Sequence, residues 1–224
     1  MNNKISKVFC LLLTLIITVA LGCKKEQPVM EEGKAKVRFV NAYLNSDPQE
    51  LYQENNKLTP QAIVYGAYSG YAEVNSGRSV FWSNGAVENK ATSAIEAVLY
   101  GNNAYTLLYY KNQDSKPSIV GYINQAGAPA AGKFKVRFVN LSIMFNDKPL
   151  VISANNNAFL NSLNFGDNPS YAELAINTEL RVNLRDSNKT TLLDKTKFQE
   201  GKNYLVWFDT SDGIEVSYHV IQEN

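Results

Sequence analysis

The chain of 224 residues contains little of the material from which catalytic and metal sites are built: one histidine and two cysteines. These are too few ligands for a zinc or copper site and too few cysteines for a disulfide framework. A phosphate-binding glycine loop and a serine nucleophile elbow are also missing from the sequence. We therefore expect no enzymatic activity, no catalytic residues, no metal and no cofactor.

An excess of charge of one sign is missing as well. The 22 Lys+Arg and 21 Asp+Glu give a net charge of +1, which excludes binding of nucleic acid through bulk positive charge. Hydrophobic residues make up 45% of the chain and aromatic residues 11%, which is enough for a packed core. The length allows one large domain or two of about 100 residues each.

The first residues have the pattern of a secretory signal peptide. Lys4 and Lys7 form a short positive region, and residues 8–22 carry no charge. This uncharged run is shorter than the roughly 20 apolar residues that a membrane-spanning helix needs, and it has the length of a signal-peptide core. We expect residues 1–22 to be a signal peptide; an N-terminal membrane anchor helix is the alternative.

The end of this run, Ala20-Leu21-Gly22-Cys23, resembles the lipobox of bacterial lipoproteins, with Ala20 where leucine is usual. The resemblance implies cleavage before Cys23 and lipidation of that residue, and several acyl chains together anchor a protein stably. Residues 23–33 would then be the lipidated cysteine and a polar tether. These features predict a lipoprotein anchored through Cys23 in the outer membrane of a Gram-negative bacterium, on either its surface or its periplasmic face.

An internal repeat organises the rest of the chain. The word KVRFVN at residues 36–41 recurs unchanged at residues 135–140, an offset of 99, and a collinear series of weaker matches follows. Such a match is far beyond chance and indicates tandem copies of one structural unit. The predicted organisation is a first repeat at residues 34–125, a linker at 126–132 and a second repeat at 133–224.

Each repeat has the pattern of a β-sandwich. Short segments rich in Val, Ile, Tyr and Phe alternate with turn signals, and Leu180, Val182 and Leu184 alternate with polar residues. This period of two is typical of half-buried strands, and about seven such segments in about 100 residues are typical of a sandwich. We predict an all-β fold, in which two tandem antiparallel β-sandwiches follow the lipoprotein signal peptide.

Three words in the first repeat point to a family. They are VRFVN at residues 37–41, YGAYSGY at 65–71 and a late word from Gly101 to Tyr105-Thr106. Together they resemble a domain-of-unknown-function family of secreted or lipid-anchored bacterial proteins that often carry two tandem copies. The resemblance covers about residues 34–222 and implies an immunoglobulin-like or transthyretin-like sandwich, with no catalytic residues.

Exposed aromatic residues are the candidate ligand-binding residues. Tyr68 lies in a Ser/Gly loop, and its counterpart in the second repeat is Asn168, so the fold does not require an aromatic residue there. The flanking Tyr65 and Tyr71 have aromatic counterparts and are expected to be structural. A flat aromatic ring beside polar groups can stack on a sugar ring or a peptide. We predict Tyr68 and Tyr110 as possible ligand-binding residues.

Other residues receive structural interpretations. Trp82, matched with Val182, and Trp207 are expected in the core, and His219 is expected to face solvent or lie on an edge strand. The loop at residues 209–213 is expected to be a hairpin turn rather than a calcium loop.

The charged residues that recur in both repeats also receive a structural interpretation. Arg38 and Arg137 are mirrored, as are Glu73 and Glu173. We expect them to form a repeated structural ion pair or to be solvated strand residues.

These features together predict a non-enzymatic, lipid-anchored cell-envelope protein that binds or adheres to glycan or protein and does not bind nucleic acid. One alternative is a structural, pilin-like envelope subunit that polymerises by strand addition. The other is an accessory glycan-binding lipoprotein of a polysaccharide uptake system.

Overall fold

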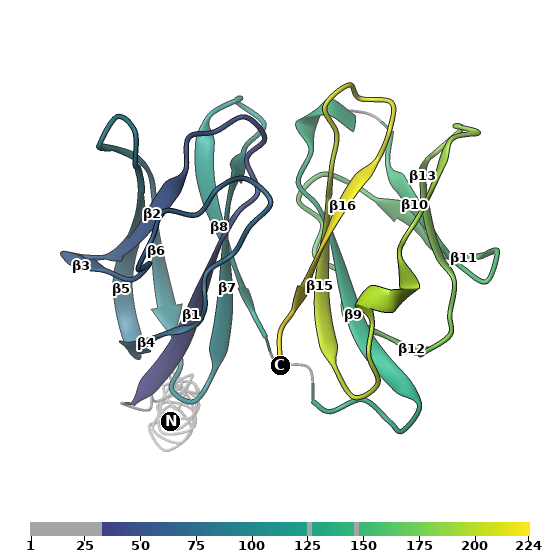
Figure 1. Cartoon of the computed structure of the whole chain (residues 1–224), viewed down its shortest axis with the longest axis horizontal. Helices are drawn as coiled ribbons and strands as arrows, with labels where there is room; N and C mark the ends of the chain where they lie inside the picture. Colours follow the sequence, from purple (N-terminus) through teal and green to yellow (C-terminus); the bar gives the residue numbers. More distant parts are fainter. Residues whose placement is uncertain (1–32, 125–126, 146–147) are drawn as a thin grey trace, which may run out of the picture. The chain divides into compact units, whose positions relative to one another are not determined.

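The computed structural model describes residues 33–124, 127–145 and 148–224, which belong to one compact unit (Figure 1). The predicted signal peptide, Cys23 and nearly all of the tether lie outside the described residues. Strands dominate the described part, with two short 3₁₀ helices, η1 (Ile143–Phe145) and η2 (Lys195–Lys197). Within these ranges, no helix is long and apolar enough to cross a bilayer.

The first repeat consists of two four-stranded sheets. The sheet that faces the second repeat, called the inner sheet below, has the order β4-β1-β7-β8. The sheet on the far side, called the outer sheet, has the order β3-β2-β5-β6. The strands are β1 (Lys34–Asn41), β2 (Gln49–Gln53), β3 (Asn56–Lys57), β4 (Ala72–Asn75), β5 (Gly77–Gly85), β6 (Lys90–Leu99), β7 (Ala104–Lys111) and β8 (Pro117–Ile123).

The second repeat has the same arrangement of two sheets. Its inner sheet has the order β12-β9-β15-β16, and its outer sheet has the order β11-β10-β13-β14. The strands are β9 (Lys133–Asn140), β10 (Leu150–Ala154), β11 (Asn157–Leu163), β12 (Ala172–Ala175), β13 (Leu180–Leu184), β14 (Thr190–Leu192), β15 (Asn203–Asp209) and β16 (Ser217–Gln222).

The predicted all-β fold with sandwich architecture is confirmed, and the pairing adds one feature. Most neighbouring strands are antiparallel, but β1 pairs in parallel with β7, and β9 pairs in parallel with β15. Parallel strands need a long crossover connection. The chain supplies one in each repeat. Between β1 and β7 it forms β2 and β3 of the outer sheet, β4 at the edge of the inner sheet, and then β5 and β6 of the outer sheet; the second repeat follows the same order.

The repeated word KVRFVN is buried on both faces of its strand. Val37 and Phe39 of β1 point into the core of the first sandwich, whereas Val40 belongs to a different hydrophobic cluster. The equivalent residues of β9 divide in the same way: Val136 and Phe138 enter the core of the second sandwich. Successive side chains of a strand point to opposite faces, so this division shows that each inner sheet is covered on both sides.

A third core covers the second face of both inner sheets. It combines side chains of the two repeats, which the structure places in one buried cluster: Val40, Ala42, Leu108, Tyr122, Val139, Leu141, Leu205, Trp207 and Ile221. The two sandwiches therefore pack inner sheet against inner sheet and share hydrophobic contacts, in addition to being joined by the predicted linker. This shared core positions the loops that follow β1, β7, β9 and β15.

The expectation that Trp82 lies in the core is wrong, whereas Trp207 is fully buried in the third core. In β5 it is Phe81 that points into the first sandwich core, so Trp82 lies on the opposite face of the outer sheet, stacked on Tyr52. A shift of one residue in the alignment of two strands moves a side chain to the other face.

Candidate functional site

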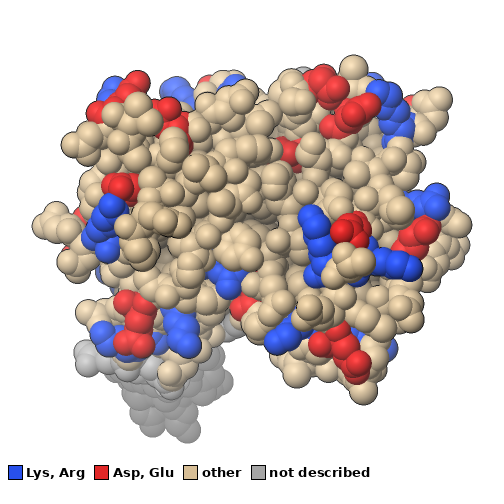
Figure 2. Space-filling view, in the orientation of Figure 1, with Lys and Arg blue, Asp and Glu red and all other residues tan. Residues whose placement is uncertain are grey.

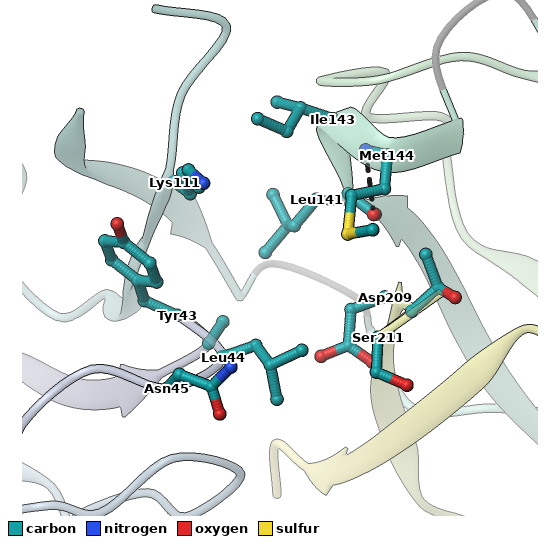
Figure 3. A pocket seen from close by; sticks show the side chains of 12 residues that line it. Tyr43, Leu44, Asn45, Lys111, Leu141, Ile143, Met144, Asp209 and Ser211 are labelled. Atoms are coloured by element: carbon teal, nitrogen blue, oxygen red, sulfur yellow. Dashed lines mark hydrogen bonds between the residues drawn. The ribbon is translucent and has the colours of Figure 1, made fainter. Parts of the chain in front are cut away.

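A pocket of about 150 Å³ lies between the two repeats, where β1, β7, β9 and β15 end (Figure 3). The loops after β1 and β9 contribute residues 42–45 and 141–144, which are equivalent at the repeat offset of 99. The ends of β7 and β15 contribute Lys111, Asp209 and the residues after Asp209. Both copies of the fold therefore build this one site.

The walls of this inter-repeat pocket are mixed in character. Leu44, Leu141 and Met144 give it an apolar surface, and Met144 is 44% exposed. Figure 3 shows the side chains of Leu44 and Asp209 near one another, with Leu141 and Met144 across the pocket. Sites for drug-sized ligands have volumes of about 300–1,000 Å³. The inter-repeat pocket is smaller, so it fits a single ring or side chain that protrudes from a larger ligand.

Asp209 is held in place by a network that crosses the interface. The Tyr65 hydroxyl of the first repeat donates a hydrogen bond to Asp209 Oδ2, and His219 Nε2 lies 3.2 Å from the same hydroxyl. The proton of Tyr65 goes to the carboxylate, so we assign the His219 hydrogen to Nε2, which donates to the tyrosine oxygen. The His219 ring stacks on Trp207, with ring centroids 3.8 Å apart.

Burial is the main cause that raises the pKa of Tyr65, and the hydrogen bond to the Asp209 carboxylate raises it further. The phenol therefore stays protonated at neutral pH, where it is a hydrogen-bond donor and a poor base or nucleophile. The network thus fixes one wall of the inter-repeat pocket. Asp209 Oδ1 lies 3.7 Å from His219 Nε2 and has no hydrogen-bond partner among the described residues.

Tyr110 occupies the position in β7 that Asp209 occupies in β15. It packs against Phe165, the counterpart of Tyr65, with ring centroids 6.1 Å apart. Equivalent positions therefore meet twice across the interface: Tyr110 and Phe165 make an apolar contact, whereas Asp209 and Tyr65 make a hydrogen bond. Tyr110 and Phe165, with the β7–β8 turn, line a second pocket of about 210 Å³. The predicted binding residue Tyr110 therefore lies at the interface, and a pocket opens beside it.

Tyr68 lies elsewhere, beside Arg38. Its side chain is 46% exposed, as its loop position suggests. The ring lies 5.1 Å from the guanidinium carbon of Arg38, which also stands over the ring of Tyr71 at 4.1 Å. The structure thus places Tyr68 on a buried arginine, whereas Tyr110 packs on an aromatic ring. The expectation for Tyr71 as a structural residue agrees with this packing.

A buried polar cluster joins the repeats around the C-terminal strand. Arg38 Nη1 donates to the Gln222 carbonyl at 2.6 Å, and Arg137 Nη2 lies 3.2 Å from Glu223 Oε1. The Tyr171 hydroxyl donates to the other oxygen of Glu223 at 2.5 Å. Burial raises the pKa of Glu223, while Tyr171 and Arg137 act in the opposite direction.

The mirrored charges therefore do not form a repeated ion pair with one another. Both arginines are buried between the repeats, and Glu73 and Glu173 are exposed. Glu173 pairs instead with Lys133. The interpretation as solvated strand residues holds for the two acids and is wrong for the two arginines.

His219 lies on an edge strand, as expected, but it does not face solvent. Its side chain is 23% exposed between Trp207 and Tyr65. Its counterpart in the first repeat is Val120. Trp207 lies opposite His219 on the neighbouring strand, and Leu108, the equivalent of Trp207, lies opposite Val120.

In the part of the chain that the structure describes, no cluster of three His, Cys, Asp or Glu side chains is arranged to hold a metal ion.

Charges of both signs are mixed over the surface. On the face in Figure 2, blue and red side chains lie beside one another, mostly toward the edges, and an uncharged area lies between them. Single-sign fields attract polyelectrolytes, and this face does not present one.

Comparisons with known proteins give a family and several remote structural similarities. The family model described as "Domain of unknown function (DUF4397)" matches residues 35–147. The search of curated proteins gives no match.

Three solved structures illustrate the remote similarities. The Eubacterium rectale Amy13K module CBMbc of family CBM26, in complex with maltoheptaose, is 8% identical over 83% of this chain and 96% of its own (TM-score 0.26). A streptococcal virulence factor described by its alpha-glucan binding is 15% identical over 83% and 96% (TM-score 0.27). A fimbrial assembly protein from Parabacteroides distasonis is 10% identical over 86% and 99% (TM-score 0.24). TM-scores this low carry no argument about ligand or assembly.

Proposed function

The chain belongs to the DUF4397 family, and we propose that it is a non-enzymatic binding or adhesion protein of the bacterial cell envelope. Its inter-repeat pocket would hold a group that protrudes from a glycan or a protein. Lipid on Cys23 would anchor it in the outer membrane of a Gram-negative bacterium.

The observation that carries the proposal is the pocket built by both repeats. Loops held by a rigid scaffold are the usual place for binding residues. Here the third core fixes the strands that precede those loops, and the network around Asp209 fixes one wall. The exposed part of Met144 adds apolar contact area beside hydrogen-bonding groups, a combination typical of ligand sites.

The charges of the pocket favour a ligand group without net charge. Lys111 and Asp209 both line it, so the positive and the negative side chain offset each other. A ring with hydroxyl groups or a polar side chain fits this balance and the volume of about 150 Å³.

The proposal that the protein is not an enzyme has support in the same chemistry. Glycoside hydrolysis uses two carboxyl groups on either side of the scissile bond. Among the residues that line the inter-repeat pocket, Asp209 is the acid, and Tyr65 already occupies its Oδ2. Tyr65 itself is held protonated by its raised pKa.

Binding by variants of the purified full chain in detergent tests the pocket. We would screen bacterial and host glycans and extracellular-matrix proteins. Met144→Asp places a charge in the pocket and should weaken a hit at least tenfold. Val87→Asp is the matched control, because Val87 is also an exposed apolar residue and does not line the pocket. Equal binding by both variants would contradict the proposed site.

Substitution of the two predicted tyrosines tests where the binding site lies. Tyr110→Ala should weaken binding by about 1 kcal/mol, which is about fivefold, because Tyr110 holds the position in β7 that the pocket residue Asp209 holds in β15. Tyr68→Ala should have a smaller effect. A larger loss of binding in Tyr68→Ala than in Tyr110→Ala would place the site on the surface around Tyr68 and Arg38.

The anchor is tested separately. Incorporation of radiolabelled fatty acid should occur in the native chain and be lost in Cys23→Ser. Labelling that survives this substitution would show that Cys23 is not the lipidated residue.

An assembling, pilin-like subunit remains the second candidate, and β6 favours it. With ten residues, β6 is the longest strand of the described part, and it forms an edge of its sheet. An edge strand presents unpaired backbone groups to which another chain can add a strand. Assembly predicts ladders on gels of unboiled samples, whereas a strictly monomeric protein would contradict it.

A further inference from the structure

The outer sheet of the first repeat carries an aromatic pair on the face that points away from the core. Tyr52 of β2 lies opposite Trp82 of β5, and their rings stack with centroids 4.3 Å apart and an interplanar angle of 13°. Trp82 Nε1 donates to the Glu54 carbonyl at 2.6 Å, which fixes the indole across β2. The neighbouring Leu51 and Phe81 fill the core, so the aromatic pair is not needed there.

The second repeat shows that the fold does not require this pair. Its equivalent strands place Ile152 opposite Val182 in the core. The next pair on the outer face, in the position of Tyr52 and Trp82, is Ser153 opposite Arg181. The same sandwich therefore forms with small and charged residues where the first repeat has two stacked rings.

The surroundings of the pair form an apolar surface with a polar rim. We define the outer aromatic patch as Tyr52, Trp82, Val80, Ala94 and Val98, which lie on one face of three neighbouring strands. Val80, Ala94 and Val98 are exposed. An exposed apolar surface with a polar rim marks an interaction site.

Two ion pairs lie at the rim of the patch, and the charges within each pair offset each other. Lys57 Nζ lies 2.5 Å from Glu50 Oε1, and the Tyr52 hydroxyl donates to Glu50 Oε2 at 3.0 Å. On the other side Arg78 pairs with Glu96. The patch therefore offers a charged ligand no excess of either sign, but it offers hydroxyl groups both donors and acceptors.

We propose that the outer aromatic patch binds a neutral polysaccharide of hexose units. A pyranose ring has an apolar face of C–H groups and a rim of hydroxyls. Tyr52 covers one face of the Trp82 ring, so the C–H face would lie on the other face, toward the small Ala94 of β6. The hydroxyls would bond to Glu50 and Lys57. The face of a sheet is open along its strands and can contact successive units of a chain, in contrast to the inter-repeat pocket, which accepts one group. This second site is independent of the pocket.

The two tryptophans of the chain make the site measurable. Trp207 is fully buried in the third core, whereas Trp82 lies on the outer face. Acrylamide should therefore quench part of the emission of the full chain in detergent, and Trp82→Phe should remove that part. Maltohexaose, cellohexaose and mannohexaose are the probes. At least one should change the Trp82 emission in a saturable way and protect it from acrylamide.

Calorimetry with the same oligosaccharides then tests individual side chains. Trp82→Ala and Tyr52→Ala should each weaken binding at least fivefold, and Ala94→Glu should weaken it without removing the stacked rings. Tyr100→Ala is the matched control, because Tyr100 is an exposed tyrosine of the same repeat outside the patch. Circular dichroism checks that each variant is folded.

Three results with the oligosaccharides would overturn the inference. They are the absence of binding to all three oligosaccharides, unchanged binding in both Trp82→Ala and Tyr52→Ala, and binding lost in Met144→Asp but kept in Trp82→Ala. The last result would support the inter-repeat pocket, so the two proposals fail separately. A protein ligand captured by the patch in place of the oligosaccharides would also contradict it.

Discussion

Replacing Trp207 by alanine should destabilise both repeats, although Trp207 belongs only to the second. The side chain is fully buried in the third core and stacks on His219. Removing a buried Trp or Phe side chain costs about 3–5 kcal/mol, and we expect about 4 kcal/mol here. Because domains have stabilities of about 5–15 kcal/mol, this loss is a large fraction of the total.

The assay uses Trp82 as a reporter of the first repeat. The chain has two tryptophans, so Trp207→Ala leaves Trp82 alone in the outer sheet of the first sandwich. With a urea dependence of about 2.5 kcal/mol per molar, a loss of about 4 kcal/mol lowers the unfolding midpoint by about 1.6 M. We expect the Trp82 signal to shift by this amount relative to the midpoint of the native chain, measured by circular dichroism.

An unshifted Trp82 transition would refute the reasoning. It would mean that the first repeat unfolds independently and gains nothing from the third core. Leu205→Ala is a second variant if Trp207→Ala does not fold: Leu205 is fully buried in the same cluster, and its truncation should cost about 3 kcal/mol.

Two further predictions concern single positions. Burial raises the pKa of Tyr122 to about 12, against 10.0 for a free side chain, so the stability it contributes is complete below pH 10 and is lost as the pH rises to about 12. In urea titrations across this range, Tyr122→Phe should lose less stability than the native chain; equal losses would exclude Tyr122 as the cause. Gly66→Ala and Gly166→Ala both introduce a side chain at positive φ, but only the Cβ at position 66 meets another side chain within 4 Å, His219 at 3.2 Å. Thermal unfolding should therefore show the larger loss for Gly66→Ala, and equal losses would count against the His219 contact.

The architecture of each repeat could be predicted from the sequence because its signals are local. The recurrence of KVRFVN and the period of two in Leu180, Val182 and Leu184 depend only on neighbouring residues. Strand β6 could not be found this way, since Lys90–Leu99 is rich in alanine and has weak β-propensity. Its pairing with β5 supplies the missing stabilisation.

The packing of the repeats on each other had a signal in the sequence. In KVRFVN, Val37 and Phe39 face one way and Val40 faces the other, so both faces of the strand are apolar. The position of Trp82 was harder to predict. The repeat offset is 101 at Leu51 and Ile152 but 99 at Phe81 and Leu180, and these differences change which residue faces the core.

The candidate site could be predicted only in part. The exposure of Tyr68 followed from its Ser/Gly loop and from Asn168 in the second repeat. The inter-repeat pocket has no local signal, because residues 42–45 and 141–144 meet only after the third core forms. The hydrogen bond between Tyr65 and Asp209 joins residues far apart in the chain for the same reason.

A binding screen tests the central claim most directly. The purified full chain would be presented to bacterial and host glycans and to extracellular-matrix proteins, alongside Met144→Asp, Trp82→Ala and the control Val87→Asp. The account predicts at least one saturable ligand whose binding is weakened by one of the first two variants and unchanged in the control. A folded chain that binds none of these ligands, or binds them equally in all variants, would contradict it.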